Sequence, residues 1–144
     1  MSELCYVMIK PGFVRDEIIE RVIDAMDDEE INVVAKARIT YDLETARLHY
    51  IEKEIKPYFK ELTDYLTSGE SYGIIFEGEN SVTRCREIVE RLRSSLKEEF
   101  NLTTDVMRNI LHCSSRTKVG NTMLELDTQR EIALFYYLKR KKNH

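Results

Sequence analysis

The 144-residue chain lacks several features that would place it in a special class of protein. Its longest apolar runs, such as Tyr72 to Phe76, are far too short to cross a bilayer. The first residues lack the basic and apolar segments of a secretory signal, so export is not expected. The three cysteines show no metal-type pairing, which favours a reduced, cytoplasmic protein.

An excess of positive charge is also missing. The formal net charge is −4, which argues against general binding of polyanions, so nucleic acid is not an expected partner. Any phosphate site must therefore use a few placed cations. No internal repeat or linker is visible, and the sequence predicts one domain over residues 1–138 followed by a disordered basic tail over residues 139–144.

The apolar pattern switches repeatedly between the periods of strands and helices. Leu4 to Ile9 is continuously apolar and predicts a central strand that is buried on both faces. Apolar spacing predicts helices over 14–26 and 82–96, and Asp42 is suited to cap a helix through about Lys53. The remaining predicted elements are a short helix between Pro57 and Gly69 and strands over 31–39, 71–77 and 131–137.

This order of elements predicts an α+β, ferredoxin-like βαββαβ fold. The expected architecture is a four-stranded antiparallel sheet with helices packed on one face. Such a fold hosts many unrelated activities, so function must be argued from particular residues.

The informative segments are Tyr6 to Pro11 (YVMIKP) and Arg108 to Ser114 (RNILHCS). Together with further landmarks in the same order, they make the chain resemble the nucleoside diphosphate kinase family from about Leu4 to Phe135. Those further landmarks are His49-Tyr50, Lys56 to Phe59, Thr67 to Gly69, Phe76 to Asn80, and Arg130 to Phe135, which matches the family's last core strand.

The resemblance implies a kinase that moves the γ-phosphate of a nucleoside triphosphate, such as ATP, to a nucleoside diphosphate. It implies a ping-pong route through phosphorylated His112. Imidazole suits this role because it attacks as a neutral base and forms a reactive phosphoramidate. Glu131 matches the carboxylate that orients the histidine, as the carboxylate of a hydrolytic triad does.

The resemblance also implies the nucleotide contacts, since phosphoryl transfer is catalysed mainly by placement and cationic stabilisation. Lys10 and Arg86 match phosphate-contacting cations, and Asn109 matches the residue that holds the sugar hydroxyls with the lysine. The other matched positions are Tyr50 and Ser114 near the histidine, Tyr58 and Val106 at the base, and Leu62 among the nucleotide contacts. Mg²⁺ held mostly by the nucleotide, and a homo-oligomeric assembly, are further implications.

The sequence departs from the family pattern at two places in the site. Ser115 stands where the family has an acidic residue that supports metal-bound water. The loop between Arg86 and Asn109 is shortened, and Glu99 aligns with a phosphate-binding arginine. Compensation by Arg91, Arg93 or Lys97 remains open.

Residues 116–123 look like an insertion, which either forms a lid or moves Glu131 out of reach of His112. The shortened loop removes a stretch that the family uses for trimer contacts, so a dimer or another assembly stays open. The alternative function is a catalytically weak nucleotide-binding or protein-interaction module of the same fold. A third possibility is that the basic tail binds nucleic acid. The alternative is that the tail is simply exposed to solvent and has no binding role.

Overall fold

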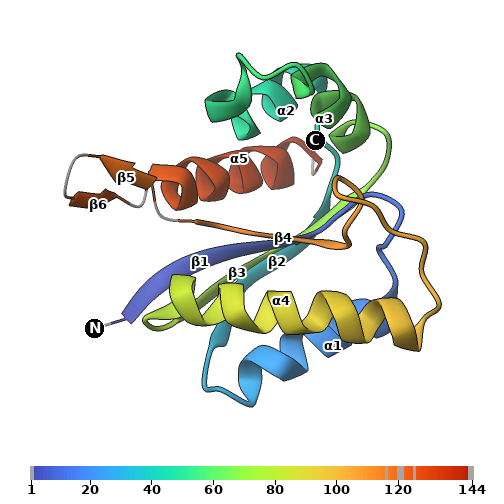
Figure 1. Ribbon diagram of the computed structural model, residues 1–144. Coiled ribbons are helices and arrows are strands. Elements are labelled where there is room, and N and C mark those ends of the chain that lie inside the picture. The colour runs from blue at the N-terminus through green and yellow to red at the C-terminus, as the bar shows by residue number, and fades with distance from the viewer. Residues whose placement is uncertain (1, 116, 120–121, 125, 143–144) are drawn as a thin grey trace.

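The computed structural model describes residues 2–115, 117–119, 122–124 and 126–142. Its centre is a four-stranded sheet in the order β2-β3-β1-β4, in which each neighbouring pair is antiparallel (Figure 1). The strands are β1 (Ser2–Ile9), β2 (Asn32–Ile39), β3 (Ser71–Glu79) and β4 (Leu111–Cys113). The predicted ferredoxin-like α+β architecture is confirmed.

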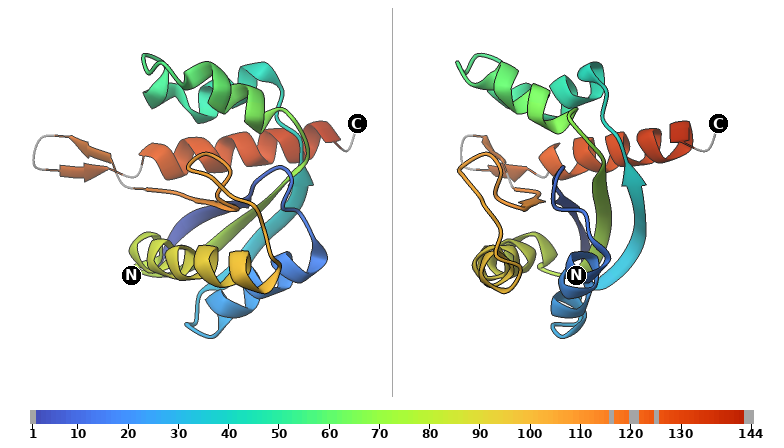
Figure 2. Two further views of the ribbon diagram at one scale, coloured as in Figure 1. Left: turned by 45° about the vertical axis from the view of Figure 1, so that its right-hand side comes forward. Right: turned by 90° about the vertical axis from the view of Figure 1, so that its right-hand side faces the viewer.

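Helices cover both faces of this sheet, so the prediction of helices on one face is wrong (Figures 1 and 2). One face carries α1 (Asp16–Asp27) and α4 (Ser81–Glu99). The other carries α2 (Leu43–His49), the 3₁₀ helix η1 (Ile51–Lys53), α3 (Phe59–Leu66) and α5 (Leu126–Lys142). Within the described part of the chain, no helix has both the length and the apolar character needed to span a bilayer.

Strand β1 is buried on both sides, as its continuous apolar run predicted. Cys5, Val7 and Ile9 belong to the core cluster that includes α1 and α4 residues, whereas Tyr6 and Met8 belong to the cluster on the α5 side. All five side chains have no exposed surface. Successive side chains of a strand point to opposite faces, so a strand with helices on both sides must be apolar throughout.

Local sequence sets the ends of the first helices. Helix α1 buries the predicted apolar stripe between Ile18 and Met26. Asp42 caps α2: its carboxylate accepts the backbone N–H of Thr45 at 2.8 Å, and the Thr45 hydroxyl accepts the backbone N–H of Asp42 at 3.0 Å. This reciprocal pair is a capping box, which satisfies backbone donors that the helix leaves open. The helix ends at His49, earlier than the predicted Lys53.

The segment 131–137 lies in helix α5, so the prediction of a last strand there is wrong, as is the match of 130–135 to a core strand. The run from Ile132 to Leu138 is apolar at every position, which mimics a buried strand. Its buried positions nevertheless recur at the spacings of three and four that mark a helix, namely Glu131, Leu134, Phe135 and Leu138. The fourth strand is instead Leu111–Cys113, which carries His112.

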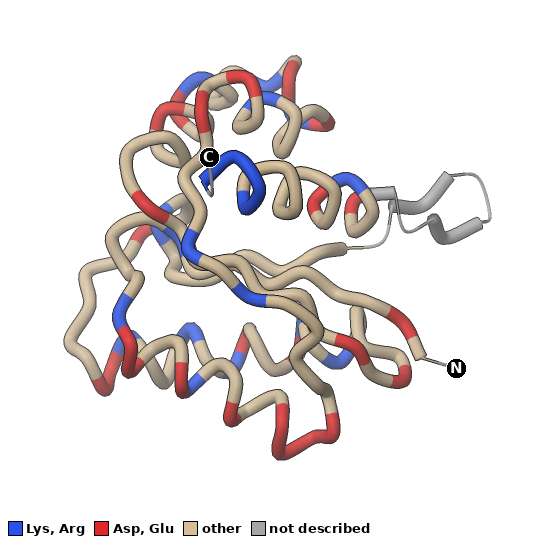
Figure 3. The backbone as a smooth tube through the Cα atoms, turned by 180° about the vertical axis from the view of Figure 1, so that it is seen from behind, with Lys and Arg blue, Asp and Glu red and all other residues tan. Residues whose placement is uncertain are grey.

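Helix α5 continues through Lys142, so the prediction of a disordered tail is wrong for residues 139–142. Residues 143 and 144 lie outside the described residues. Lys141 forms an ion pair with Asp42 at 3.0 Å, and Lys142 lies 4.0 Å from Glu70. Figure 3 shows the basic residues gathered at the carboxyl end of the helix, where the helix dipole favours positive charge.

The segment that looks like an insertion lies partly outside the described residues. Its described parts form the strands β5 (Thr117–Val119) and β6 (Thr122–Leu124), which pair as an antiparallel hairpin ahead of α5. In Figure 1 this hairpin projects beyond the amino end of α5. It does not separate Glu131 from His112, as the contacts of the site show.

Candidate active site

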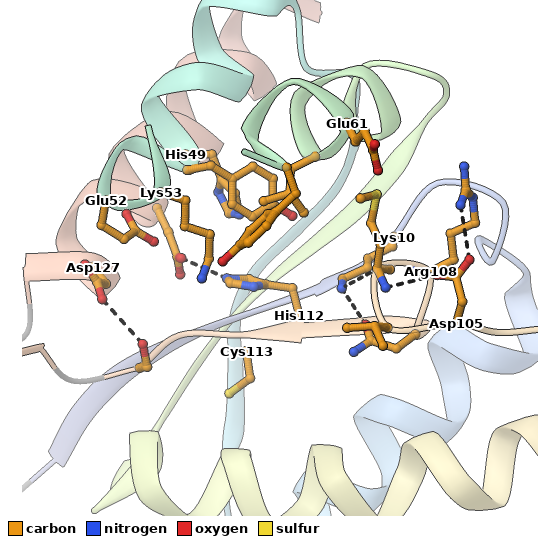
Figure 4. A pocket seen from close by; sticks show the side chains of 18 of the residues that line it. Lys10, His49, Glu52, Lys53, Glu61, Asp105, Arg108, His112, Cys113 and Asp127 are labelled. Carbon is orange, nitrogen blue, oxygen red and sulfur yellow. Dashed lines mark hydrogen bonds and ion pairs between the residues drawn. The ribbon is translucent and has the colours of Figure 1, made fainter. Parts of the chain in front are cut away.

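A cavity of about 930 Å³ gathers most of the residues that the sequence singled out (Figure 4). Its walls come from the end of β1, from the α2–α3 segment, from α4, from the loop before β4, from β4 and from α5. The lining includes Lys10, Tyr50, Arg86, Asn109, His112 and Glu131. The fold thus brings residues from distant parts of the sequence to one place.

His112 is held by Glu131. The Nε2 atom of His112 lies 2.8 Å from Oε2 of Glu131, and the second carboxylate oxygen accepts a hydrogen bond of 2.8 Å from the Ser114 hydroxyl. Ser114 also accepts the backbone N–H of Tyr6 at 3.0 Å, which ties β4 to β1. When Nε2 carries the proton and donates it in a hydrogen bond to a carboxylate, Nδ1 carries the lone pair. The arrangement therefore leaves Nδ1 as the nucleophilic nitrogen of the ring.

Glu131 is a buried carboxylate that stays ionised. Only 3% of its surface is exposed. Burial alone raises the pKa of Glu131, but the neighbouring His112, its hydrogen bond and the Ser114 hydroxyl together hold this pKa at about 2. The group can therefore accept a hydrogen bond from the Nε2–H, and balance positive charge on the ring, throughout the neutral range.

The backbone just before His112 is strained. Ile110 has φ of 78°, and the N–H of Leu111 bonds the carbonyl of Asn109 at 2.9 Å across it. This is a γ-turn with positive φ, a conformation that is rare and costly for a β-branched residue. Burial of the Ile110 side chain, and a 2.8 Å bond from the Lys10 N–H to its carbonyl, hold the turn in place. Such strain is characteristic of functional sites.

Lys10 is a buried cation beside Asn109. Its ammonium donates to the Asn109 side-chain oxygen and, at 3.1 Å, to the carbonyl of Met107. Burial is the main cause that lowers the pKa of Lys10 to about 8; nearby Arg93 lowers it further, and Asp105 opposes the shift. A strand-end surface lysine would not be so enclosed, because only 8% of Lys10 is exposed. Its position suits contact with a ligand in the cavity.

His49 and Tyr50 form an aromatic wall next to His112. The His49 ring lies 4.8 Å from the His112 ring and 4.7 Å from the Tyr50 ring, measured between centroids. Burial lowers the pKa of His49 to about 3, so this ring is neutral. Neither of its nitrogens has a hydrogen-bond partner among the described residues. These contacts indicate that His49 packs against its neighbours and has a structural role.

His49, His112 and Glu131 also offer metal-ligand atoms within 4.8 Å of one another. Two imidazoles and a carboxylate suit zinc-like ions better than magnesium, which prefers oxygen ligands. An ion there would compete for the Nε2 atom that Glu131 holds. We therefore read the trio as an orienting contact for His112.

Two arginines of helix α4 line the cavity, and Glu99 does not. Arg86 places Nη1 within 3.5 Å of the Cys113 carbonyl and 3.4 Å of the Ser114 carbonyl, next to the strand that bears His112. Arg93 is the second arginine. Glu99 pairs with Arg21 instead, so its carboxylate does not oppose phosphate in the cavity.

Tyr58, Leu62 and Val106 line the outer part of the cavity. Tyr58 is 41% exposed and Val106 is 97% exposed, so their apolar surfaces face solvent and can receive a planar base. Phe59, the neighbour of Tyr58, packs instead against the core beneath α5. One residue of the Tyr58-Phe59 pair is thus available for a ligand and the other is structural.

One residue, Ser114, behaves differently from its sequence assignment, and another, Asp127, had no assignment. Ser114 is fully buried and is not among the cavity-lining residues, so it acts on Glu131 rather than on a ligand. Asp127, which sequence reasoning missed, lines the cavity and accepts a hydrogen bond of 3.4 Å from Ser115. A carboxylate thus stands beside the hydroxyl that replaces the family's acidic residue. No sequence signal could have revealed it, since Asp127 comes from another element.

Comparison with known proteins decides the family. The family model described as nucleoside diphosphate kinase matches residues 3–140. The chain belongs to the nucleoside diphosphate kinase family. The chain is 31% identical to a nucleoside diphosphate kinase from Natronomonas pharaonis, in an alignment that covers 94% of this chain and 86% of that protein. A nucleoside diphosphate kinase from Archaeoglobus fulgidus is likewise 31% identical, covering 93% and 86% of the two chains.

Solved structures of nucleoside diphosphate kinases have the same fold. The structure of the Halobacterium salinarum enzyme in complex with CDP aligns with a TM-score of 0.71 and 26% identity, over 94% of this chain and 88% of that chain. The Aquifex aeolicus enzyme aligns with a TM-score of 0.73 and 22% identity, over 94% and 95%. The protein is therefore a phosphotransferase with nucleoside diphosphate kinase function, as its motifs predicted.

Proposed function

We propose that this nucleoside diphosphate kinase takes the γ-phosphate of a nucleoside triphosphate, ATP above all, onto Nδ1 of His112 and passes it to a nucleoside diphosphate. The single observation that carries this proposal is the 2.8 Å contact between Nε2 of His112 and Glu131. It fixes the tautomer in which the nitrogen away from Glu131 is the nucleophile.

Each half-reaction exchanges one bond. The Nδ1 lone pair attacks the γ-phosphorus, and the bond to the bridging oxygen breaks, so the diphosphate leaves with that electron pair. The phosphorylated ring becomes an imidazolium whose Nε2 proton stays on the ring, and Glu131 balances its charge. A terminal oxygen of the second diphosphate then attacks the phosphorus, and the P–N bond breaks to restore neutral His112. Lys10 and Arg86 stabilise the charge on the transferred group.

The nucleotide lies along the cavity with its base outward. Tyr58, Leu62 and Val106 contact the base, and a stacking clamp of this kind accepts purines and pyrimidines alike. Asn109 and Lys10 hold the sugar hydroxyls, which their mutual hydrogen bond positions them to do. Tyr50 closes the inner wall, where burial raises its pKa and keeps its hydroxyl protonated.

Members of the family generally use a divalent metal ion, and we assign Mg²⁺ to this protein. The ion supplies charge neutralisation on the β and γ phosphates. The residues present fit it, because Asp127 and Ser115 give oxygen donors at the cavity wall. Asp127 would take the place of the acidic residue that is missing at position 115 and would, with Ser115, help to hold the ion.

The proposal extends to assembly and compartment. β2 is an edge strand of the sheet, and its Val33 and Val34 are 37% and 50% exposed, which supports a homo-oligomer. The three cysteines of the protein are free thiols, which fits the reducing cytoplasm. The pairing of Lys141 and Lys142 with acidic residues weakens the case for a nucleic-acid-binding tail.

The decisive experiment uses ATP labelled on the γ-phosphate. Wild type and His112→Ala are incubated with labelled ATP and Mg²⁺, and protein-bound label is tested for lability in acid and stability in alkali. We expect label on wild type alone, and its discharge by added nucleoside diphosphate. Absence of label from a wild type that still binds nucleotide would reject the phosphohistidine route and favour the catalytically weak binding module. His49→Phe serves as the control for a neighbouring imidazole and should be labelled.

A further inference from the structure

Besides Lys10 and Arg86, three further cations line the cavity: Lys53, Arg93 and Arg108. Arg93 lies two helical turns beyond Arg86 on α4 and lines the same cavity as Lys10 and His112. Residues seven apart on a helix share a face, so both arginines project to the same side. Lysine or arginine side chains elsewhere on this helix do not join them.

The other two candidates on α4 face elsewhere. Arg91 forms an ion pair with Glu29 at 2.8 Å and lines a separate hollow on the α1 side of the molecule. Lys97 is exposed and is not among the cavity-lining residues. Of the three residues that could compensate for the shortened loop, only Arg93 therefore faces the cavity.

The guanidinium of Arg93 is anchored but not saturated. Its Nη2 atom donates to the carbonyl of Leu111 at 2.9 Å, immediately before His112, and Nη1 pairs with Glu90 at 2.9 Å. The buried Nε–H has no partner among the described residues. A guanidinium carries five N–H donors, so donors remain after these two contacts. Anchoring on Leu111 fixes the charge next to the strand of the nucleophile.

The positive charge of Arg93 affects the pKa of the neighbouring Lys10. Arg93 contributes, after burial, to the lowered pKa of Lys10. Cations that disfavour one another in an unliganded cavity are stabilised when an anion enters between them. A phosphate group is the anion that such a cluster fits, because arginine pairs with phosphate through parallel N–H bonds.

We propose that Arg93 is a third phosphate-binding residue of this enzyme, which contacts the terminal phosphates of the nucleotide together with Lys10 and Arg86. This inference rests on the proposed function of the cavity as a nucleotide site. Arg93 stabilises the phosphoryl group during transfer to and from His112, and thereby replaces from helix α4 the cation that the shortened loop lacks. Since the transition state spreads charge over three equatorial oxygens that a placed cation stabilises, the loss of Arg93 lowers the rate as well as the affinity.

The test compares Arg93→Ala with Arg91→Ala, which removes the same charge two residues away on the same helix. We expect Arg93→Ala to slow phosphorylation of His112 by ATP roughly tenfold to a hundredfold or more. Its affinity for ADP should fall while its affinity for adenosine stays unchanged, because only ADP carries the phosphates. Arg91→Ala should behave as wild type in all three measurements.

Two further variants separate binding from a merely structural role. Arg93→Lys should recover part of the phosphorylation rate, and guanidinium added to Arg93→Ala at non-denaturing concentration should do the same. Lys53→Ala tests another cation of the cavity, which extends into it from η1 (Figure 4), and a smaller loss than that of Arg93→Ala is expected.

The proposal is overturned if Arg93→Ala keeps the wild-type rate and ADP affinity, or if it loses affinity for ADP and adenosine equally. It is also overturned if Lys53→Ala alone shows the phosphate-specific loss. A wild type that forms no phosphohistidine would instead reject the proposed function. The comparison of ADP with adenosine would still decide whether Arg93 binds phosphate.

Discussion

Ser114 donates a hydrogen bond of 2.8 Å to the carboxylate oxygen of Glu131 that does not contact His112. Each oxygen of the Glu131 carboxylate therefore has a hydrogen-bond partner. Ser114 fixes the rotation of the carboxylate, and the oxygen that Ser114 does not contact faces Nε2 of His112. Because Ser114 follows β4 while Glu131 lies on α5, one hydrogen bond couples the docking of that helix to the orientation of His112. Such coupling is what makes a catalytic tautomer reproducible.

The first prediction concerns the charge of Glu131. In Glu131→Gln the amide can donate to Nε2, which stabilises the tautomer with its proton on the attacking nitrogen. Phosphorylation of His112 should slow by about 10²–10⁴-fold, as when a triad carboxylate is replaced by an amide. Single-turnover labelling with γ-labelled ATP measures this rate. Ser114→Ala is the milder comparison, since it frees the carboxylate without removing its charge; equal rates in wild type and Glu131→Gln would contradict the orienting role.

The second prediction concerns pH. The pKa of Lys10 is lowered to about 8, so the free enzyme loses this cation as pH rises through that value. The ratio kcat/KM, which reports groups of the free enzyme, should fall above about pH 8. Bound phosphate favours the charged ammonium, so kcat should hold to higher pH. In Lys10→Arg the basic limb should disappear, whatever the absolute rate; a limb that persists there must belong to another group.

The third prediction concerns stability in acid. His49 has a folded pKa of about 3 against an ordinary value of 6.5, so the unfolded chain binds a proton that the folded protein refuses. The free energy of unfolding should therefore decrease as pH falls below 6.5, by roughly 1.4 kcal/mol per pH unit from this group. His49→Phe keeps the ring packing and should flatten the profile. Urea unfolding at several pH values provides the measurement, and parallel profiles for the two proteins would refute the assignment.

In the same unfolding experiment, Glu131 affects the free energy of unfolding over a different pH range from His49. Its pKa is lowered to about 2 from 4.5, so its stabilising effect is complete above pH 4.5 and is lost as pH falls through about 2. The window between pH 6.5 and 4.5 consequently reports His49 without this second contribution.

The fourth prediction concerns the close approach of α5 to β3. A Cβ on Gly73 would lie 2.6 Å from Cδ1 of Phe135 and 2.8 Å from the Tyr6 hydroxyl, and both rings are fully buried. Gly73→Ala should therefore cost about 1–3 kcal/mol of stability and slow phosphorylation of His112, because α5 carries Glu131. Gly69→Ala is the matched control. Its Cβ would meet only Pro11 at an ordinary 3.6 Å, so thermal unfolding should separate the two variants clearly.

Sequence alone determined the features that depend on local pattern. The apolar run of β1, the helical stripe of α1 and the Asp42 cap all follow from side-chain periodicity and backbone donors. Ordered motifs predicted the nucleoside diphosphate kinase family, which the family model over residues 3–140 confirms, and they proposed His112 and its polar neighbours as the site.

Tertiary structure decided what periodicity could not. The segment 131–137 is apolar enough for a strand, and only packing on the sheet shows it to be a helix that buries every third or fourth side chain. Strand β4 is too short for any pattern, and it exists because β1 offers it partners. Only the fold shows that Arg93 faces the cavity whereas Arg91 faces Glu29. The same holds for Asp127, which lies beside Ser115 because α5 packs next to the end of β4. Sequence gives the type of each charge, whereas only the fold sets the few ångströms on which its interaction energy depends.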